Sequence, residues 1–334
     1  MDEGLEKQRP WVFPVRFAVS IALLSALAWH VRHDFTWSSL VPKWTPEAII
    51  WLVAATASIV VGFALATVRW WQTLQALQVR VRLRSLLSHT LAGQFISAFL
   101  PGTVGGDVLR MTRLTKECRD GPRAFASVVL ERLTGWLVLP AMTIVGLLTN
   151  PGLRRALGSE RLLFVVSVAC VTLAGLGLLL FVANHPRLGG RLSKAEGWQR
   201  FLGAVHVGVN GLGRRPTTIL GVVGAALLYQ LSMVLTFWMV ARSLRVEQLG
   251  LTALLAFVPV VLMVQVVPIS VGGLGVREAT LVYLLGALGV PKTEALAVGL
   301  LFYALVLAAS AVGAPAFAVG ARPSGAFELA QPRR

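Results

Sequence analysis

The 334-residue chain is 56% hydrophobic and only 14% charged, with a mean hydropathy of +0.72. Soluble domains carry roughly a quarter charged residues, so this composition excludes a water-soluble globular protein and predicts one all-α polytopic membrane domain over residues 1–334. The formal net charge of +16 would suit nucleic-acid binding, but no aromatic-interleaved basic patch or DNA-binding motif accompanies it. Basic loops on the cytoplasmic side of a membrane explain the charge better.

Six apolar segments are long enough to cross the hydrocarbon, which takes about 20 helical residues. They are 13–31, 48–68, 124–148, 162–183, 217–241 and 294–320. The first follows basic residues and contains small residues from Ser25 to Ala28, so a cleavable signal peptide is the alternative. We expect this helix to be retained, because the basic residues then distribute best across the membrane.

Two other apolar stretches predict re-entrant hairpins rather than crossings. Residues 86–100 are short and end before a Pro-Gly pair, and residues 107–119 that follow carry six charged side chains, which lipid accepts only at high cost. Residues 251–290 hold two apolar runs that break between Pro268 and Gly275. A segment that enters, breaks and leaves on the same side is tolerated where protein or water satisfies its backbone.

The basic residues favour a topology with both termini cytoplasmic. With both broken stretches re-entrant, the cytoplasmic segments hold 21 of the 31 basic residues and the outer segments hold nine. The loop 69–84 contributes four arginines, namely Arg69, Arg80, Arg82 and Arg84. If 86–100 crossed the membrane, this loop and the basic segment 110–123 would face opposite sides, against the positive-inside rule. We expect a plasma-membrane protein with 69–84 and 184–216 cytoplasmic and 31–47 outside.

A ten-residue motif occurs twice, 167 residues apart. Residues 101–110 (PGTVGGDVLR) align without gaps on residues 268–277 (PISVGGLGVR), and both read Pro-x-[Ser/Thr]-Val-Gly-Gly-x-x-[Val/Leu]-Arg. In the predicted topology the two copies enter from opposite sides. We therefore predict two inverted repeats, 48–148 and 217–320, an architecture typical of secondary transporters. Close helix packing at Gly-Gly is the simpler alternative, but it leaves the shared Pro, hydroxyl residue and Arg unexplained.

The motif has the groups that an anion site needs. Proline breaks the entering helix, the glycines free the backbone, and the exiting helix is expected to begin near Asp107 or Leu274 with its N–H groups open to an anion. The arginine of each copy is expected in the first turn, where its planar group can hold a phosphate through two hydrogen bonds. The broken backbone should also need a water-filled cavity. The motif thus nominates Thr103, Gly105, Gly106, Asp107, Arg110, Ser270, Gly272, Gly273, Arg277 and Glu278.

Two ionisable residues inside an apolar segment complete the candidate substrate-binding site. Glu131 and Arg132 lie seven and eight residues after the start of 124–148, and such residues usually face the bundle interior and serve function or pair with one another. Neighbours on a helix point about 100° apart. We therefore expect separate partners, Arg110 for Glu131 and Asp107 for Arg132.

Simpler roles stay open for some of these residues. Asp107 is equally suited to cap its helix, Arg110 to act as a cytoplasmic topology signal, and Arg277 and Glu278 to neutralise each other. The sequence has no Walker loop, His-Glu-x-x-His or Gly-x-Ser-x-Gly motif, and its cysteines show no metal-site spacing. We expect no cofactor, no metal and no catalytic residue, and a transporter rather than an enzyme.

Three sequence blocks resemble the flippase-like membrane domain of lysylphosphatidylglycerol synthases and its stand-alone relatives. They are 99–107 (FLPGTVGGD), 127–132 (SVVLER) and 268–278 (PISVGGLGVRE), and with the helix pattern the resemblance covers about 48–320. It implies translocation of an aminoacylated phospholipid, or of glycan or polyprenyl carriers. The two-part enzymes of this family carry a soluble aminoacyl-transfer domain after the membrane region, and this chain stops at Arg334, so we do not expect aminoacyl-lipid synthesis from it.

Together these observations predict a flippase-like transporter of a phosphate-bearing lipid. Its expected partners are membrane lipids with anionic headgroups, and not nucleic acid; a separately encoded envelope-synthesis enzyme is a further candidate partner. Two rivals remain open. One is a membrane-embedded enzyme on lipid-linked sugars with Asp107 or Glu131 as its base, and the other is a non-transporting scaffold for envelope synthesis.

Overall fold

The computed structural model describes residues 12–31, 41–99, 104–184, 203–206, 208, 216–266, 270 and 273–320, and within them all regular structure is helical. Five helices in this part of the chain are long and apolar enough to cross a membrane. They are α3 (Pro46–Ala76), α6 (Gly121–Thr149), α7 (Pro151–Asn184), α10 (Pro216–Ser243) and α13 (Lys292–Ser310), which continues through a short turn into α14 (Ala314–Ala318). The prediction of an all-α polytopic membrane protein is confirmed.

Helix α1 (Val12–Val31) occupies the first predicted crossing and has 20 residues, about the number that a crossing takes. The other five predicted crossings are the long apolar helices.

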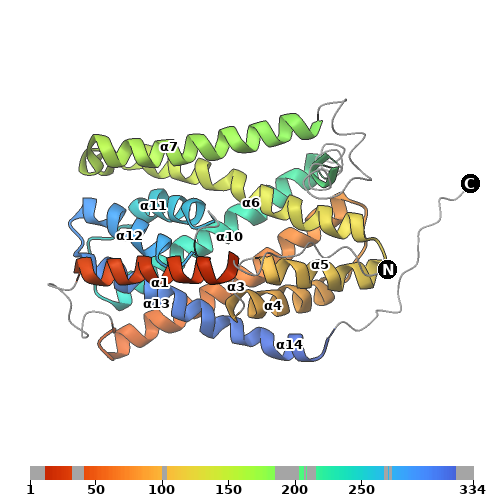
Figure 1. Cartoon of the computed structure of the whole chain (residues 1–334), viewed down its shortest axis with the longest axis horizontal. Helices are drawn as coiled ribbons and strands as arrows, with labels where there is room; N and C mark the ends of the chain where they lie inside the picture. The colour runs from red at the N-terminus through yellow and green to blue at the C-terminus, as the bar shows by residue number, and fades with distance from the viewer. Residues whose placement is uncertain are drawn as a thin grey trace, which may run out of the picture.

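Two pairs of shorter helices occupy the stretches predicted as re-entrant hairpins. The first pair is α4 (Leu83–Phe99) with α5 (Val104–Cys118), and the second is α11 (Leu251–Val264) with α12 (Val276–Leu285). At 1.5 Å per residue even α4 is only about 26 Å long, short of the hydrocarbon thickness. In Figure 1 the α4–α5 pair lies in the right-hand half of the bundle and the α11–α12 pair in the left-hand half. This placement suits hairpins that enter from opposite sides, while the inverted repeat itself stays a prediction.

The helix termini follow from local sequence. Thr45 caps α3 by accepting a hydrogen bond from the Ala48 amide, and Asp120 caps α6 by accepting one from the Arg123 amide at 2.9 Å. A proline follows each cap directly or one residue later, where its missing N–H is harmless. Helix α7 bends at Gly158, whose φ of 66° suits a residue without a side chain.

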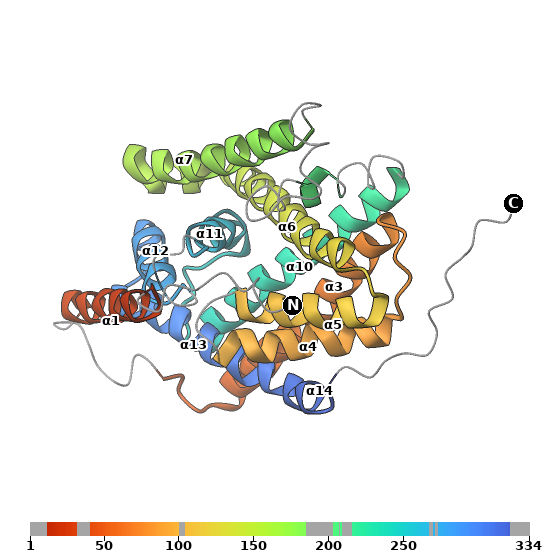
Figure 2. The ribbon, with the colours of Figure 1, turned by 45° about the vertical axis from the view of Figure 1, so that its right-hand side comes forward.

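Two apolar cores hold the helices together. The larger core joins α6, α10, α11 and α13, and the rings of Phe237 and Phe302 stack there with centroids 4.0 Å apart. The smaller core lies beneath the first hairpin, around Trp70, Leu86 and Leu114. Figure 2 shows α1 and α7 at the edge of the bundle, with α11 and α12 between them. Polar groups that lie between the cores are therefore enclosed by protein.

Candidate functional site: a buried ion network

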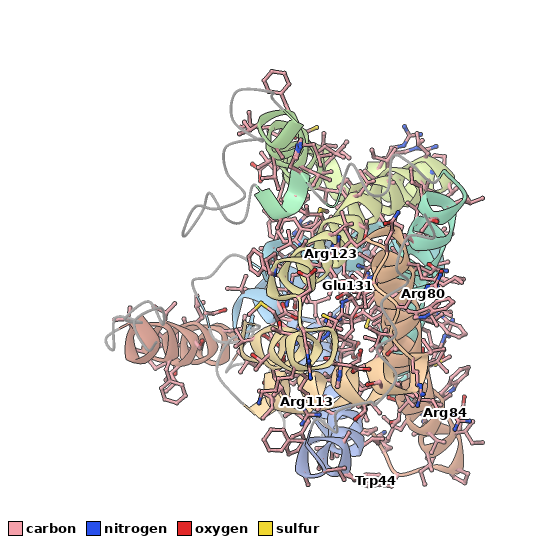
Figure 3. The ribbon with its side chains drawn as sticks, turned by 90° about the vertical axis from the view of Figure 1, so that its right-hand side faces the viewer. Trp44, Arg80, Arg84, Arg113, Arg123 and Glu131 are labelled. Carbon is pink, nitrogen blue, oxygen red and sulfur yellow. The ribbon has the colours of Figure 1, made fainter. Side chains whose placement is uncertain are left out.

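Glu131 on α6 joins three helices through its carboxylate. Its Oε1 accepts a hydrogen bond from Arg69 Nη2 on α3 at 2.5 Å, and its Oε2 accepts one from Arg110 Nη2 on α5 at 2.6 Å. Only 3% of Glu131 is exposed, and both arginines are buried. Figure 3 views the bundle from the right-hand end of Figure 1, with Glu131 among the helices and Arg80 and Arg84 toward the periphery.

Asp107 and Arg132 extend this network to the protein surface. Arg132 Nε donates to Asp107 Oδ2, and Arg110 Nη1 lies 3.5 Å from Asp107 Oδ1. The Arg132 side chain is 42% exposed, although it lies roughly 17 Å along α6 from the start of the helix. A charge at that depth is costly to place against lipid. Both pairings predicted from the sequence, Glu131 with Arg110 and Arg132 with Asp107, are present.

The network carries more positive than negative charge. Among the described residues, its three arginines face two carboxylates, which gives these five residues a formal charge of +1. Arg69 Nε, Arg69 Nη1 and Arg110 Nε are buried and have no hydrogen-bond partner among the described residues. A buried donor without a partner is destabilising by about 1–3 kcal/mol. The network therefore has both charge and donors to offer to an anion.

Aromatic residues and glycines shape the surroundings of the two buried arginines. The Arg110 guanidinium lies 4.1 Å from the Trp70 ring centroid, and the Arg69 guanidinium lies 5.1 Å from that of Tyr229. A Cβ atom on Gly135 would come within 2.9 Å of Arg69 Nη1. These contacts fix the planes of the guanidinium groups and leave little space for another side chain beside Arg69.

Gly106 of the first motif serves helix packing. Gly106 is buried, and a Cβ atom there would lie 2.3 Å from the Gly93 carbonyl oxygen and 2.0 Å from Ser97 Oγ on α4. The expected water-filled cavity is therefore wrong at Gly106, where protein fills the space; Gly105 is half-buried. Helix α5 begins at Val104, so Asp107 lies within its first turn rather than at its start, and Arg110 lies in its second turn rather than its first.

The second motif has a different arrangement. Helix α12 begins at Val276, and Arg277 pairs with its neighbour Glu278, both fully enclosed. Glu278 also accepts a hydrogen bond from the Gly275 amide at 2.7 Å. Arg277 lies over the Tyr303 ring at 4.8 Å. This pair has no net charge, so the neutralisation considered for it in the sequence is what the structure contains.

The structure thus assembles part of the nominated set. Asp107, Arg110, Glu131 and Arg132 form one network, and Arg277 and Glu278 form a separate pair. Ser270 is buried with no hydrogen-bond partner for its hydroxyl among the described residues, and Gly273 adopts a φ of 79° beside Gln265. Thr103 and Gly272 lie outside the described residues.

Arg69 is the residue that sequence reasoning misplaced. It was assigned to a cytoplasmic loop, but α3 continues to Ala76 and carries Arg69 inside the bundle. A signal for this was available, because no proline or glycine occurs between Ala64 and Ala76 to end the helix. Arg113, also counted as a loop charge, is buried and donates to the carbonyl oxygens of Ala316 and Phe317 at 2.9 and 3.0 Å.

A comparison with protein families matches residues 15–313 to the family described as the lysylphosphatidylglycerol synthase TM region. The chain belongs to this family. The matched range includes both hairpins and every residue of the ion network, and it confirms the resemblance noted in the sequence. A search of curated protein sequences finds no match. The chain is therefore a multi-pass membrane domain of a family named for the membrane region of a phospholipid synthase.

Proposed function

We propose that this chain moves a phosphate-bearing lipid, either a phospholipid or a polyprenyl-phosphate-linked lipid, across the plasma membrane. The ion network around Glu131 is the proposed contact for the headgroup phosphate. The observation that carries this proposal is the excess positive charge of the described network together with three guanidinium nitrogens that have no hydrogen-bond partner among the described residues. A phosphate monoanion or diester would balance that charge and accept those hydrogen bonds.

The proposed transport step exchanges one anion for another. Arg132 and Asp107 lie at the exposed edge of the network and would meet the headgroup first. The phosphate would then compete with Glu131 for Arg110 and Arg69, which Glu131 now holds together. Binding of the phosphate would replace the ion pairs between Glu131 and the two arginines. Because Glu131 can form these ion pairs again, the phosphate can be released.

We expect the stronger phosphate contact at the first motif. Arg277 is committed to Glu278 and to the aromatic ring of Tyr303, and this pair has no spare charge. The motif by itself predicts a phosphate contact at the arginine of each copy. The pairing of Arg277 with Glu278 supports a weaker phosphate contact at the second motif. Variants of Arg277 and Arg110 can therefore be compared directly.

The geometry gives less support to the rival functions. A general base needs a free carboxylate oxygen within reach of a substrate proton, and each oxygen of Glu131 already accepts a hydrogen bond from a guanidinium group. A scaffold needs no buried network with unbalanced charge. Transport is therefore the proposal that uses the observed arrangement most fully.

Reconstitution of the purified protein into phosphatidylglycerol vesicles tests this function. Fluorescent phosphatidylglycerol should exchange between leaflets faster in protein-containing vesicles than in empty ones, as followed by dithionite quenching. We expect Arg110→Ala to slow exchange about tenfold or more, because a hydrogen bond to a charged group contributes roughly 1.5–3 kcal/mol. Arg110→Lys should also slow it, because lysine lacks the planar fork.

Arg84→Ala is the matched control, since Arg84 is an exposed arginine of the same hairpin; its exchange rate should equal that of the wild type. Arg277→Ala should slow exchange less than Arg110→Ala. Circular dichroism and size-exclusion chromatography confirm that each variant is folded. Wild-type exchange no faster than that of empty vesicles would refute the transport proposal, and a chemical change of the lipid seen by mass spectrometry would favour the enzyme.

A further inference from the structure

The first hairpin contains a second polar cluster, separate from the ion network. On α4, Ser85 Oγ donates to Glu117 Oε2 of α5 at 2.6 Å, and His89 Nε2 lies 2.8 Å from the same oxygen. The His89 and Glu117 side chains are 4% and 8% exposed. None of these groups was nominated from the sequence, and none contacts the headgroup in the function proposed above.

The chemistry of the cluster identifies the atom that can take up a proton. An ionised carboxylate only accepts hydrogen bonds, so His89 Nε2 carries the hydrogen that it shares with Glu117. The other ring nitrogen, Nδ1, is then a bare lone pair in the neutral ring and an N–H in the charged ring. This Nδ1 is buried and has no hydrogen-bond partner among the described residues. Imidazole is the side chain that ordinarily gains and loses a proton between pH 5 and 8.

The other charged groups nearby are already engaged or lie elsewhere. On α5, Arg113 donates to two carbonyl oxygens of α14, and Lys116 is exposed. On α3, Arg69 is held by Glu131. In α13 and α14 the titratable residues are Lys292 and Glu294 in the first turn and Tyr303. Glu117 is therefore the charged side chain that the structure places directly on His89.

The hairpin links this cluster to the ion network. His89 lies one helical turn before Gly93, and a Cβ atom on Gly93 would come within 2.7 Å of Arg110 Cγ. The two helix backbones are also in contact at Gly93 and Gly106. A change in how α4 is held against α5 at His89 would therefore shift the backbone against which Arg110 packs.

We propose that Ser85, His89 and Glu117 form a proton-binding site that controls the position of α4 against α5, and through it the exchange of anions at Arg110. A proton added at Nδ1 converts a neutral imidazole beside a carboxylate into a buried ion pair between the two helices, and it also makes Nδ1 a buried donor without a partner among the described residues. The protonated and the neutral ring should therefore hold α4 against α5 differently. The transport part of this inference rests on the proposed function; the proton site itself does not.

Nuclear magnetic resonance tests the site without any transport assay. The protein is labelled with ¹⁵N at its histidines, of which the chain has five, and placed in lipid nanodiscs; His89→Asn identifies the His89 signal. Spectra recorded from pH 8 to pH 5 follow the protonation of the His89 ring at Nδ1, and its signals should move in Glu117→Gln. A His89 ring that stays in one protonation state over that range would overturn the proposal.

Vesicle assays at the same pH values then test control of transport. Wild-type exchange should differ several-fold between the two ends of the range, while His89→Asn and Glu117→Gln should exchange lipid at a rate that no longer depends on pH. His206→Asn is the matched control, because His206 bonds through Nδ1 to a backbone carbonyl, that of Ala183, and it should keep the response. The proposed control of transport would be contradicted if both hairpin variants kept the pH dependence. It would also be contradicted if the rate of lipid exchange by the wild type did not depend on pH. Absence of exchange at every pH would instead refute the proposed function and leave the resonance experiment to decide the proton site.

Discussion

Glu131 shows how a single residue can organise a membrane protein site. Its carboxylate is shared by arginines from α3 and α5, so one side chain holds two other helices against α6. Burying charges is unfavourable unless each has close partners, and removing one partner leaves the others uncompensated. Among the described residues the compensation is incomplete, because three arginines face two carboxylates. That imbalance is the feature we connect with an anionic ligand.

Glu131→Gln should separate binding from transport. The amide keeps the shape of the side chain and raises the formal charge of the network from +1 to +2, so an anionic lipid should bind more tightly and be exchanged more slowly. The loss of one partner from a buried ion pair should also lower the free energy of unfolding by about 3–5 kcal/mol. Lipid binding to detergent-solubilised protein, vesicle exchange and thermal unfolding measure the three effects.

Glu47→Gln provides the control for this variant, because Glu47 is an exposed acid in the first turn of α3. It should change neither lipid binding nor exchange. Weaker lipid binding in Glu131→Gln, with the protein folded, would contradict the competition between phosphate and carboxylate.

Among the helices, the α4–α5 hairpin depends on backbone contact rather than on large side chains. Gly93 and Gly106 face each other so closely that neither position has room for a methyl group. Small residues at such positions allow membrane helices to approach closely and pack well. Arg113 adds a polar link from α5 to the end of α14. The hairpin therefore presents Asp107 and Arg110 from a tightly packed support.

Gly106→Ala should destabilise the protein. The new Cβ atom would meet backbone atoms of Gly93 that cannot rotate away, and overpacking of this kind typically lowers stability by about 1–3 kcal/mol. Gly175→Ala on α7 is the matched control, since nothing lies within 4 Å of its Cβ position; alanine there should be neutral or stabilising by up to about 1 kcal/mol. Thermal unfolding in detergent compares the two, and equal midpoints would show that the hairpin does not need this close contact.

Across the whole molecule, the two hairpins lie in opposite halves of the bundle (Figure 1), and exposed arginines occur in the connections before and after the first hairpin. Arg80, Arg82 and Arg84 lie in the connection from α3 and at the start of α4, and Arg119 and Arg123 lie around the start of α6. The positive-inside rule predicts that this end is cytoplasmic. The opposite entry of the two hairpins would then give each membrane face its own broken helix.

Cysteine labelling tests that orientation. In a background without Cys118 and Cys170, a cysteine at Arg82 or Arg200 should react with a membrane-impermeant reagent only from the cytoplasmic side, and one at Pro42 only from outside. Arg200 lies outside the described residues, so its side rests on the sequence. Opposite sides for Arg82 and Arg200 would overturn the topology and the inverted relation between the two motifs.

The sequence by itself determined the class of protein, the two hairpins and the central ion pairs. Low charge content and long apolar segments leave a membrane as the only suitable environment. The Pro-Gly breaks locate the hairpins because they act on the local backbone. Glu131 and Arg132 indicate a functional site because an apolar segment carries ionisable residues only at a high energetic cost. Their partners could therefore be sought among the few other charged residues nearby.

Only the tertiary structure decided which further groups join each site. Arg69 reads as a loop charge, His89 as part of an apolar stretch and Glu117 as one charge of the segment 107–119, until the rotation and depth of α3, α4 and α5 are known. The same applies to the two motifs, which match in seven of ten positions yet place one arginine in a shared network and the other on its own neighbour. Local sequence sets where a helix bends or ends, whereas the partner of a buried charge depends on which faces of distant helices meet.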